Sequence, residues 1–143
     1  MEDRYLYKAK TTPKEKGEFN NVWVTGNLIV SNGKYYIHPV GNVVNVKNEI
    51  GRIIVMHEVI PDTICQCTGL KDKNGNLIWE NDIVKDERGN LYKAFWQNNY
   101  YQFSWICVKS DVFSIGAKWD LWSFKSFEIE VIGNIFDNPE LLH

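Results

Sequence analysis

Residues 59–85 constrain the fold more than any other part of the chain, because turn-forming residues and alternating apolar residues follow one another closely there. Pro61 fixes its own φ and disfavours helical geometry at the preceding residue, so we expect a turn at 61–63. Asn74-Gly75 is a pair favoured by type I′ hairpin turns, which need positive φ at both residues. The segment therefore predicts short β-strands joined by tight turns.

A second hairpin signal, Asn32-Gly33, lies earlier in the chain. The residues before it, 22–31, alternate with a period of two that Gly26 interrupts, which predicts a strand with a bulge or a sharp bend. Residues 34–39 follow as the partner strand. These two segments predict a hairpin in the first third of the chain.

The rest of the chain repeats these signals. Glu80-Asn81-Asp82 predicts another tight turn, since Asn tolerates left-handed backbone better than most residues. Gly133 breaks the pleat of a late strand, and Asn138-Pro139 begins a terminal helical turn. Residues 109–125 have no clean period and predict a long connection pinned by aromatic side chains, with one helical turn. Further strands are expected at 4–8, 91–96, 100–108 and 127–131, with two more inside 41–56.

The resulting fold class is mainly β, with two small antiparallel subdomains that meet near Pro61. We expect them to comprise residues 1–58 and 59–143. The closely spaced strands and turns of the second are typical of a small SH3-like or OB-like barrel. A chain of 143 residues is long enough to fold without disulfides or metals.

Several motifs are similar to those of one protein family: Thr68-Gly69-Leu70, Asp72-Lys73-Asn74-Gly75, residues 78–84, 130–135 and 138–142. They resemble the YopX family of phage and prophage proteins. Residues 4–7 and 23–26 resemble that family's beginning, so the similarity spans nearly the whole chain. Where such proteins usually carry Glu-Gly-Asp, this chain has Glu80-Asn81-Asp82, which suits the same backbone. The resemblance implies a small, β-rich, phage-derived protein and brings no established activity or catalytic residue.

Charge, apolar runs and cysteine content indicate the binding partners and the cellular compartment to expect. A net charge of −2 and a pI near 5.9 give no overall attraction to nucleic acid or to an anionic membrane. No apolar run is long enough to span a bilayer, so we expect a protein of the host cytoplasm. Cys65 and Cys67 point to the core side of one strand, and with Cys107 they make an odd number, which indicates reduced thiols.

No catalytic constellation is evident, and no phosphate loop, nucleophile elbow or zinc-protease pattern occurs. Glu80 and Asp82 stand two apart and would share a face of a strand, where they could hold Mg²⁺ in a small metal-dependent hydrolase. Zinc held by Cys65, Cys67 and His57, or a catalytic role for His38 at a strand end, is less favoured than a structural role. We therefore expect a protein that is not an enzyme and holds no cofactor.

A single-stranded nucleic-acid binder is the alternative function. Lys93, Trp96, Tyr100 and Lys109 would form a stacking platform with positive charge if they faced outward. Tyr101, Phe103 and Trp105 alternate onto one face, which we interpret as core rather than as part of this platform.

The favoured function is a non-catalytic phage or prophage accessory that binds an unknown host or phage protein and associates with itself. Small β-rich chains with many aromatic residues often bury them between identical subunits. The segment after Lys125 has acidic residues but no lysine or arginine, and it could meet the lysine-rich residues 8–16 of a neighbouring copy. A contact within one chain is equally compatible with this pattern.

Overall fold

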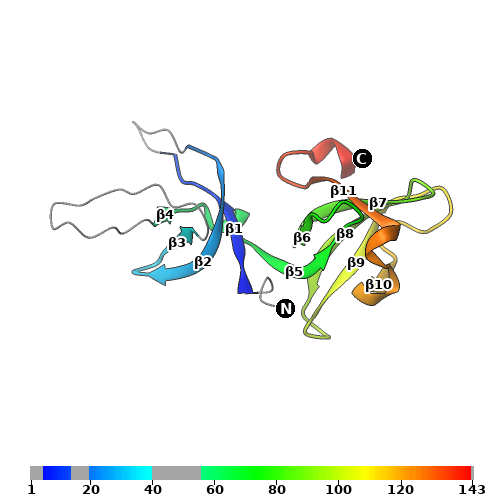
Figure 1. The fold of residues 1–143 in the computed structure, drawn as a ribbon, viewed down its shortest axis with the longest axis horizontal. Coiled ribbons are helices and arrows are strands. Elements are labelled where there is room, and N and C mark those ends of the chain that lie inside the picture. The colour runs from blue at the N-terminus through cyan, green and yellow to red at the C-terminus, as the bar shows by residue number, and fades with distance from the viewer. Residues whose placement is uncertain (1–4, 14–19, 40–55, 143) are drawn as a thin grey trace. The chain divides into compact units, whose positions relative to one another are not determined.

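The computed structural model describes residues 5–13, 20–39 and 56–142, and it confirms a mainly β protein (Figure 1). The chain divides into two compact units, with the boundary between Gln66 and Cys67. In the described ranges the regular elements are antiparallel strands and short 3₁₀ turns. The predicted strands within 41–56 lie outside the described residues, apart from Met56.

The first unit is one antiparallel sheet in the order β4-β3-β2-β1-β5, of which β5 contributes only its start. Its strands are β1 (Tyr7–Lys10), β2 (Trp23–Ser31), β3 (Lys34–Pro39), β4 (His57–Glu58) and β5 (Cys65–Lys71). The 3₁₀ turn η2 (Pro61–Thr63) precedes β5, which confirms the turn predicted from Pro61. Asn32 and Gly33 both have positive φ, 51° and 72°, so the predicted β2–β3 hairpin is confirmed.

Glycine at position 26 is needed for a reason other than the predicted bulge or sharp bend. The β2 ladder runs through it without a register shift, with Tyr7 opposite on β1 and Pro39 opposite on β3. A Cβ at this position would overlap the carbonyl oxygen of His38. Glycine is therefore required because two backbones approach closely, a reason that local sequence does not reveal. The core of this unit is centred on buried Ala9, Ile37 and Val59.

The second unit contains a five-stranded antiparallel sheet in the order β10-β9-β8-β7-β11. Its strands are β7 (Asp82–Asp86), β8 (Leu91–Gln97), β9 (Gln102–Lys109), β10 (Lys118–Asp120) and β11 (Ile129–Asn134). The short strand β6 (Leu77–Trp79) is not part of this sheet and pairs with β5. Short 3₁₀ turns lie at η3 (Leu121–Ser123), η4 (Ser126–Glu128) and η5 (Pro139–Leu142). The core cluster consists of Ile78, Val84, Tyr92, Ala94, Trp105, Cys107 and Ile129.

The predicted SH3-like or OB-like closure is not confirmed, because the sheet formed by the described residues ends at β10 and at β11. β10 has only three residues and lies inside the segment expected to be a long connection. The edge of β11 is occupied by the turn after β5: Lys73 N–H donates to Ile129 O (3.0 Å), and Val131 N–H donates to Asp72 Oδ2 (2.9 Å). These bonds occupy groups that a closing strand would need.

The turn at Asn74-Gly75 joins β5 to β6 as predicted, but the predicted type I′ geometry is wrong. Only Gly75 has positive φ, at 82°. Asp72 Oδ1 accepts hydrogen bonds from the backbone N–H groups of Asn74 and Asn76, each at 2.9 Å, and this Asx-type bonding sets the loop. An aspartate at the start of the turn therefore decided the turn type.

Other local predictions are confirmed. Asn81 has φ of 70°, the left-handed conformation expected of it. The β11–β7 register shifts between Val131 and Gly133, and η5 begins at Pro139. The first strand begins at Tyr7, later than the expected start, which lies outside the described residues.

Candidate functional site

The residues predicted to stack on nucleic acid lie at separate places on the β8–β9 hairpin. Tyr100 is exposed in the connecting turn, and Trp96 lies just before it on β8. Lys93 faces the opposite side of the sheet from Trp96, because strand side chains alternate. Lys109 ends β9, the end remote from the turn. The hairpin thus places Trp96 and Tyr100 near its turn, with Lys93 on the other face and Lys109 at the far end.

The predicted core face of this hairpin needs one correction. Trp105 is buried and Phe103 is half-buried, as expected, but Tyr101 is 83% exposed. Tyr101 has φ of 51° and lies in the turn, so it does not continue the alternation of β9. Positive φ is uncommon for a tyrosine, and the sequence pattern contains no signal for it.

Glu80 and Asp82, the residues considered for metal binding, flank the turn residue Asn81. Asp82 is buried, and its Oδ2 accepts a hydrogen bond from Trp79 N–H at 2.8 Å. This bond stabilises the turn between β6 and β7. Across the described ranges, no group of three or more His, Cys, Asp or Glu side chains is placed to hold a metal ion.

The cysteines and the two histidines considered above differ in their burial. All three cysteines are buried and form no disulfide with any described residue, and Cys65 and Cys67 lie on the inward face predicted for them. Burial raises the pKa of the Cys107 thiol, which keeps it protonated. His38 is exposed on β3, and His57 is half-buried on β4.

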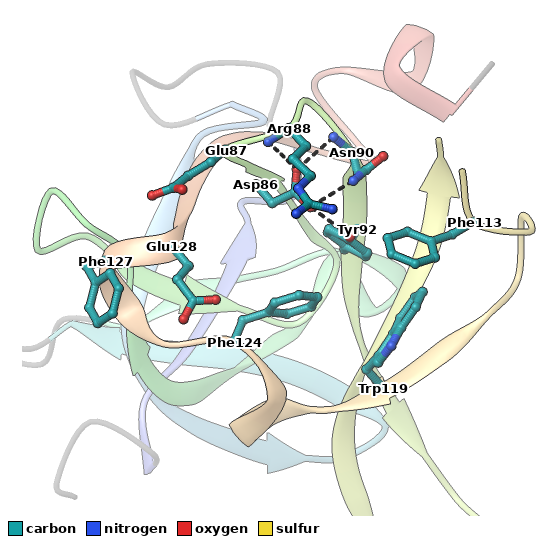
Figure 2. Close-up of a pocket in the computed structure, with 10 residues that line it drawn as sticks. All are labelled: Asp86, Glu87, Arg88, Asn90, Tyr92, Phe113, Trp119, Phe124, Phe127 and Glu128. Carbon is teal, nitrogen blue, oxygen red and sulfur yellow. Dashed lines mark hydrogen bonds between the residues drawn. The ribbon is translucent and has the colours of Figure 1, made fainter. Parts of the chain in front are cut away.

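A cavity of about 430 Å³ in the second unit gathers a different set of residues (Figure 2). It lies where the turn after β7, the segment after β9, strand β10 and the turns η3 and η4 come together. Its lining consists of Asp86, Glu87, Arg88, Asn90, Tyr92, Phe113, Trp119, Phe124, Phe127 and Glu128. Five of these residues are aromatic and four are charged.

The aromatic wall is a set of rings in mutual contact. Tyr92 meets Trp119 edge-on at 5.4 Å between centroids and Phe124 at 4.7 Å. Phe113 packs against the other part of Trp119, at 5.2 Å. Edge-to-face geometry of this kind is favourable beyond simple burial and holds the rings in place. The wall is therefore preformed by residues that the protein core already orders.

Asp86 organises the polar side of the cavity. Its Oδ1 accepts from the N–H groups of Arg88 (3.0 Å) and Asn90 (2.9 Å), and its Oδ2 accepts from Asn90 Nδ2 and Tyr92 OH, both at 2.9 Å. Burial raises the pKa of this carboxyl, but the hydrogen bonds together outweigh it and hold the pKa below its usual value. Burial, followed by the bond to Asp86, raises the pKa of Tyr92. At neutral pH Asp86 is therefore charged and Tyr92 neutral.

Asn90 joins this network to the segment that carries Phe113. Ser110 Oγ donates to Asn90 Oδ1 at 2.7 Å. Ser110 Oγ also accepts hydrogen bonds from the N–H groups of Val112 and Phe113, at 3.0 and 2.9 Å. The turn after β7 thereby fixes the position of a ring on the opposite wall. Figure 2 shows Phe113 beside Tyr92, with Glu128 and Phe127 across the opening.

A second hollow, of about 550 Å³, lies beside the β8–β9 turn and shares Trp119 with the cavity. Gln102 Nε2 donates to Asp120 Oδ1 (2.7 Å) and to Ser104 Oγ (3.2 Å), which ties β9 to β10. Tyr100 lines the hollow, and Trp122, next to its lining residue Ser123, is 81% exposed. The lining of this hollow thus combines polar residues with two aromatic ones, Tyr100 and Trp119.

The comparison with protein families decides the relationship suggested by the motifs. The model of the YopX protein family matches residues 3–143, essentially the whole chain. The chain belongs to the YopX family. A search of the curated proteins found no match. The match over essentially the whole chain thus shows family membership, and the candidate site rests on the geometry described above.

Sequence reasoning missed the cavity, although one signal for it was present. The pattern Asp-x-x-Gly-Asn occurs at 72–76 and again at 86–90, and in this YopX-family chain both aspartates close the same kind of turn. Trp119 and Phe124 were expected only to pin a connection. Their meeting with Tyr92 depends on the pairing of β10 with β9, which the sequence did not predict.

Proposed function

We propose that this YopX-family protein is a non-catalytic phage or prophage accessory of the host cytoplasm, which binds a partner protein through its second unit and associates with itself. The observation that carries the proposal is the exposure of three large aromatic residues on that unit, Tyr100, Tyr101 and Trp122, at 67%, 83% and 81%. Aromatic side chains are enriched at the centres of protein interfaces. Tyr100 and Tyr101 are consecutive in one turn, and exposed apolar surface gathered in this way is typical of an interaction site.

Self-association has additional support from the charge pattern. The tail that follows Lys125 carries Glu128, Glu130 and Glu140, whereas Lys8 and Lys10 lie over the ring of Trp23 at 4.6 and 5.4 Å. Opposite charges on separate copies favour encounter and orientation more than they add affinity. The aromatic residues therefore supply the buried contact in this proposal, and the charges supply the orientation.

Light scattering after size-exclusion chromatography tests self-association, with absorbance at 260 and 280 nm recorded on the same peak. We expect an oligomer of defined mass that carries no nucleic acid. Trp122→Ala should shift the mass toward the monomer, while Tyr5→Ala, which removes a similarly exposed ring from the first unit, should not. A wild-type monomer at micromolar concentration would remove self-association from the proposal.

Single-stranded nucleic-acid binding is the second candidate, because Trp96 and Tyr100 lie near the same end of the β8–β9 hairpin and Lys118 lines the hollow that Tyr100 also lines. Base–aromatic stacking contributes about 1–3 kcal/mol per base. Fluorescence anisotropy with labelled oligonucleotides at low salt tests it, since electrostatic binding is strongest there. Binding that Tyr100→Ala weakens would favour this candidate, and a flat titration would eliminate it.

A further inference from the structure

We propose that the aromatic cavity of the second unit binds one basic side chain, an arginine or a lysine, of the partner protein. The inference rests on the proposed function, because it takes the ligand to be part of a protein. It goes further in assigning the site and the chemical class of the group that enters it.

The size and lining of the cavity suit a side chain with an apolar stem. Its volume of about 430 Å³ lies within the range of small-ligand sites, roughly 300–1,000 Å³. Phe124 and Trp119 are only partly buried and Phe113 is 40% exposed, so ring surface faces the opening. Methylene groups of a lysine or arginine stem would cover this surface and remove it from water.

The charge of the lining selects a cation over an anion. Three carboxylates, those of Asp86, Glu87 and Glu128, line the cavity against one guanidinium, that of Arg88. Faces of aromatic rings also attract cations, by about 0.5–1 kcal/mol at exposed sites and more where water is excluded. Rings and carboxylates together therefore favour a positively charged group with an apolar stem.

The carboxylates are not equivalent. Asp86 is occupied by four hydrogen bonds and supplies charge but little free acceptor capacity. Glu87 and Glu128 take part in no ion pair with any residue that the structure describes, and Figure 2 shows the Glu128 carboxylate directed to the space near Phe124. Glu128 is thus the acceptor best placed for an entering ammonium or guanidinium group.

A substitution of Arg88 should change the affinity for a cation in the opposite direction from the loss of a carboxylate. Arg88 is the one cation of the lining, and its backbone N–H, rather than its side chain, serves the Asp86 turn. Removing its charge should strengthen binding of a cation by removing a repulsion. The same change should weaken binding if the cavity takes an anion.

The experiment is a ¹H–¹⁵N NMR titration of the full chain with blocked tripeptides. Ac-Gly-Arg-Gly-NH₂ and Ac-Gly-Lys-Gly-NH₂ are the cationic probes, and Ac-Gly-Gln-Gly-NH₂ and Ac-Gly-Glu-Gly-NH₂ are the neutral and anionic controls. We expect saturable shifts of the Trp119 indole and of the Gly89 and Phe127 amides with the cationic probes only. Equal shifts with the neutral probe, stronger shifts with the anionic one, or none up to high millimolar concentration would overturn the proposal.

The variants locate the effect. Glu128→Gln should weaken binding of the arginine probe by about threefold to tenfold, and Arg88→Gln should strengthen it by about twofold to fivefold. Glu140→Gln, the same chemical change outside the lining, should leave it unchanged. If Glu128→Gln does not fold, Phe127→Ala, at a lining ring that is 64% exposed, tests the same site and should also weaken binding of the arginine probe, because it removes ring surface.

These outcomes are separable from those of the proposed function. None of the variants alters Tyr100, Tyr101 or Trp122. Glu128→Gln and Glu140→Gln each remove one tail charge, which in the proposed function supplies orientation and not the buried contact, so the oligomer mass should stay that of the wild type. Probe binding by a monomeric protein would support the cavity assignment and contradict self-association. An oligomer that binds no probe would contradict only the cavity assignment.

Discussion

Asp86 illustrates how much a single side chain does in so small a protein. Its carboxylate closes the turn after β7 and orients Tyr92, which in turn packs against Trp119 and Phe124. A half-buried acceptor of this kind contributes more through the donors it satisfies than through its own charge. Loss of Asp86 would leave the Tyr92 hydroxyl and the Asn90 amide without their acceptor.

We predict that Asp86→Asn lowers the free energy of unfolding by about 1–3 kcal/mol at pH 6, because the amide nitrogen cannot accept the bonds made by Oδ2. The folded pKa of Asp86 is held below its ordinary value of 3.8, so its contribution is complete well above pH 3.8 and is lost as the pH falls through the folded pKa. The difference between wild type and variant should therefore shrink between pH 6 and pH 3.

Urea denaturation at several pH values measures this difference. Asp111→Asn, at an exposed position, is the matched control and should change the unfolding midpoint little at any pH. A wild-type advantage that stays constant down to pH 3 would show that shape, and not ionisation, makes Asp86 important.

At the scale of elements, the β2–β3 hairpin depends on two glycines for different reasons. Gly33 supplies positive φ in the β2–β3 turn, where nothing lies within 4 Å of a Cβ. Gly26 lies in the middle of β2, where a Cβ would overlap the backbone of β3. The first need is local and the second is a matter of strand packing, so substitutions at the two sites have different costs.

Gly26→Ala should destabilise the first unit by about 3 kcal/mol or more, because backbone atoms cannot move aside as a flexible side chain can. Gly33→Ala should cost about 1–2 kcal/mol, the ordinary penalty for a left-handed alanine. Thermal melts of the two variants followed by circular dichroism provide the comparison. Equal losses at both positions would mean that β2 and β3 can separate locally at Gly26.

For the whole molecule, the main feature is that apolar side chains gather in two clusters. One is centred on Ala9, Ile37 and Val59, and the other contains Tyr92, Trp105 and their neighbours. Among the strands that the structure describes, β5 alone takes part in pairing in both units: Gln66 pairs with Tyr7, and Cys67 pairs with Trp79. In the described ranges, no helix has the length and apolar character needed to cross a membrane.

Separate cores predict separate responses to a core mutation. Ile37→Ala removes a fully buried side chain and should cost about 2–5 kcal/mol. Hydrogen exchange should then accelerate for amides of β2 and β3, while amides of β8 and β9 keep their protection. Faster exchange in all four strands would indicate that the two units unfold as one.

The sequence by itself determined the elements whose cause is local. Prolines, Asn-Gly pairs and two-residue alternation were enough to predict the β class, both hairpins, the left-handed Asn81 and the break at Gly133. Family motifs along the chain were enough to predict the YopX relationship. These features follow from the φ and ψ preferences of a few neighbouring residues.

Only the tertiary structure decided features that depend on distant residues. Examples are the open edge at β10, the contact between Gly26 and His38, the exposure of Tyr101, and the cavity around Tyr92. Each requires segments distant in sequence to pack together, and alternation along one strand does not specify the neighbour it will meet. The physical reason is that strand pairing and ring packing are non-local, so a cavity forms only once the sheet has brought its walls together.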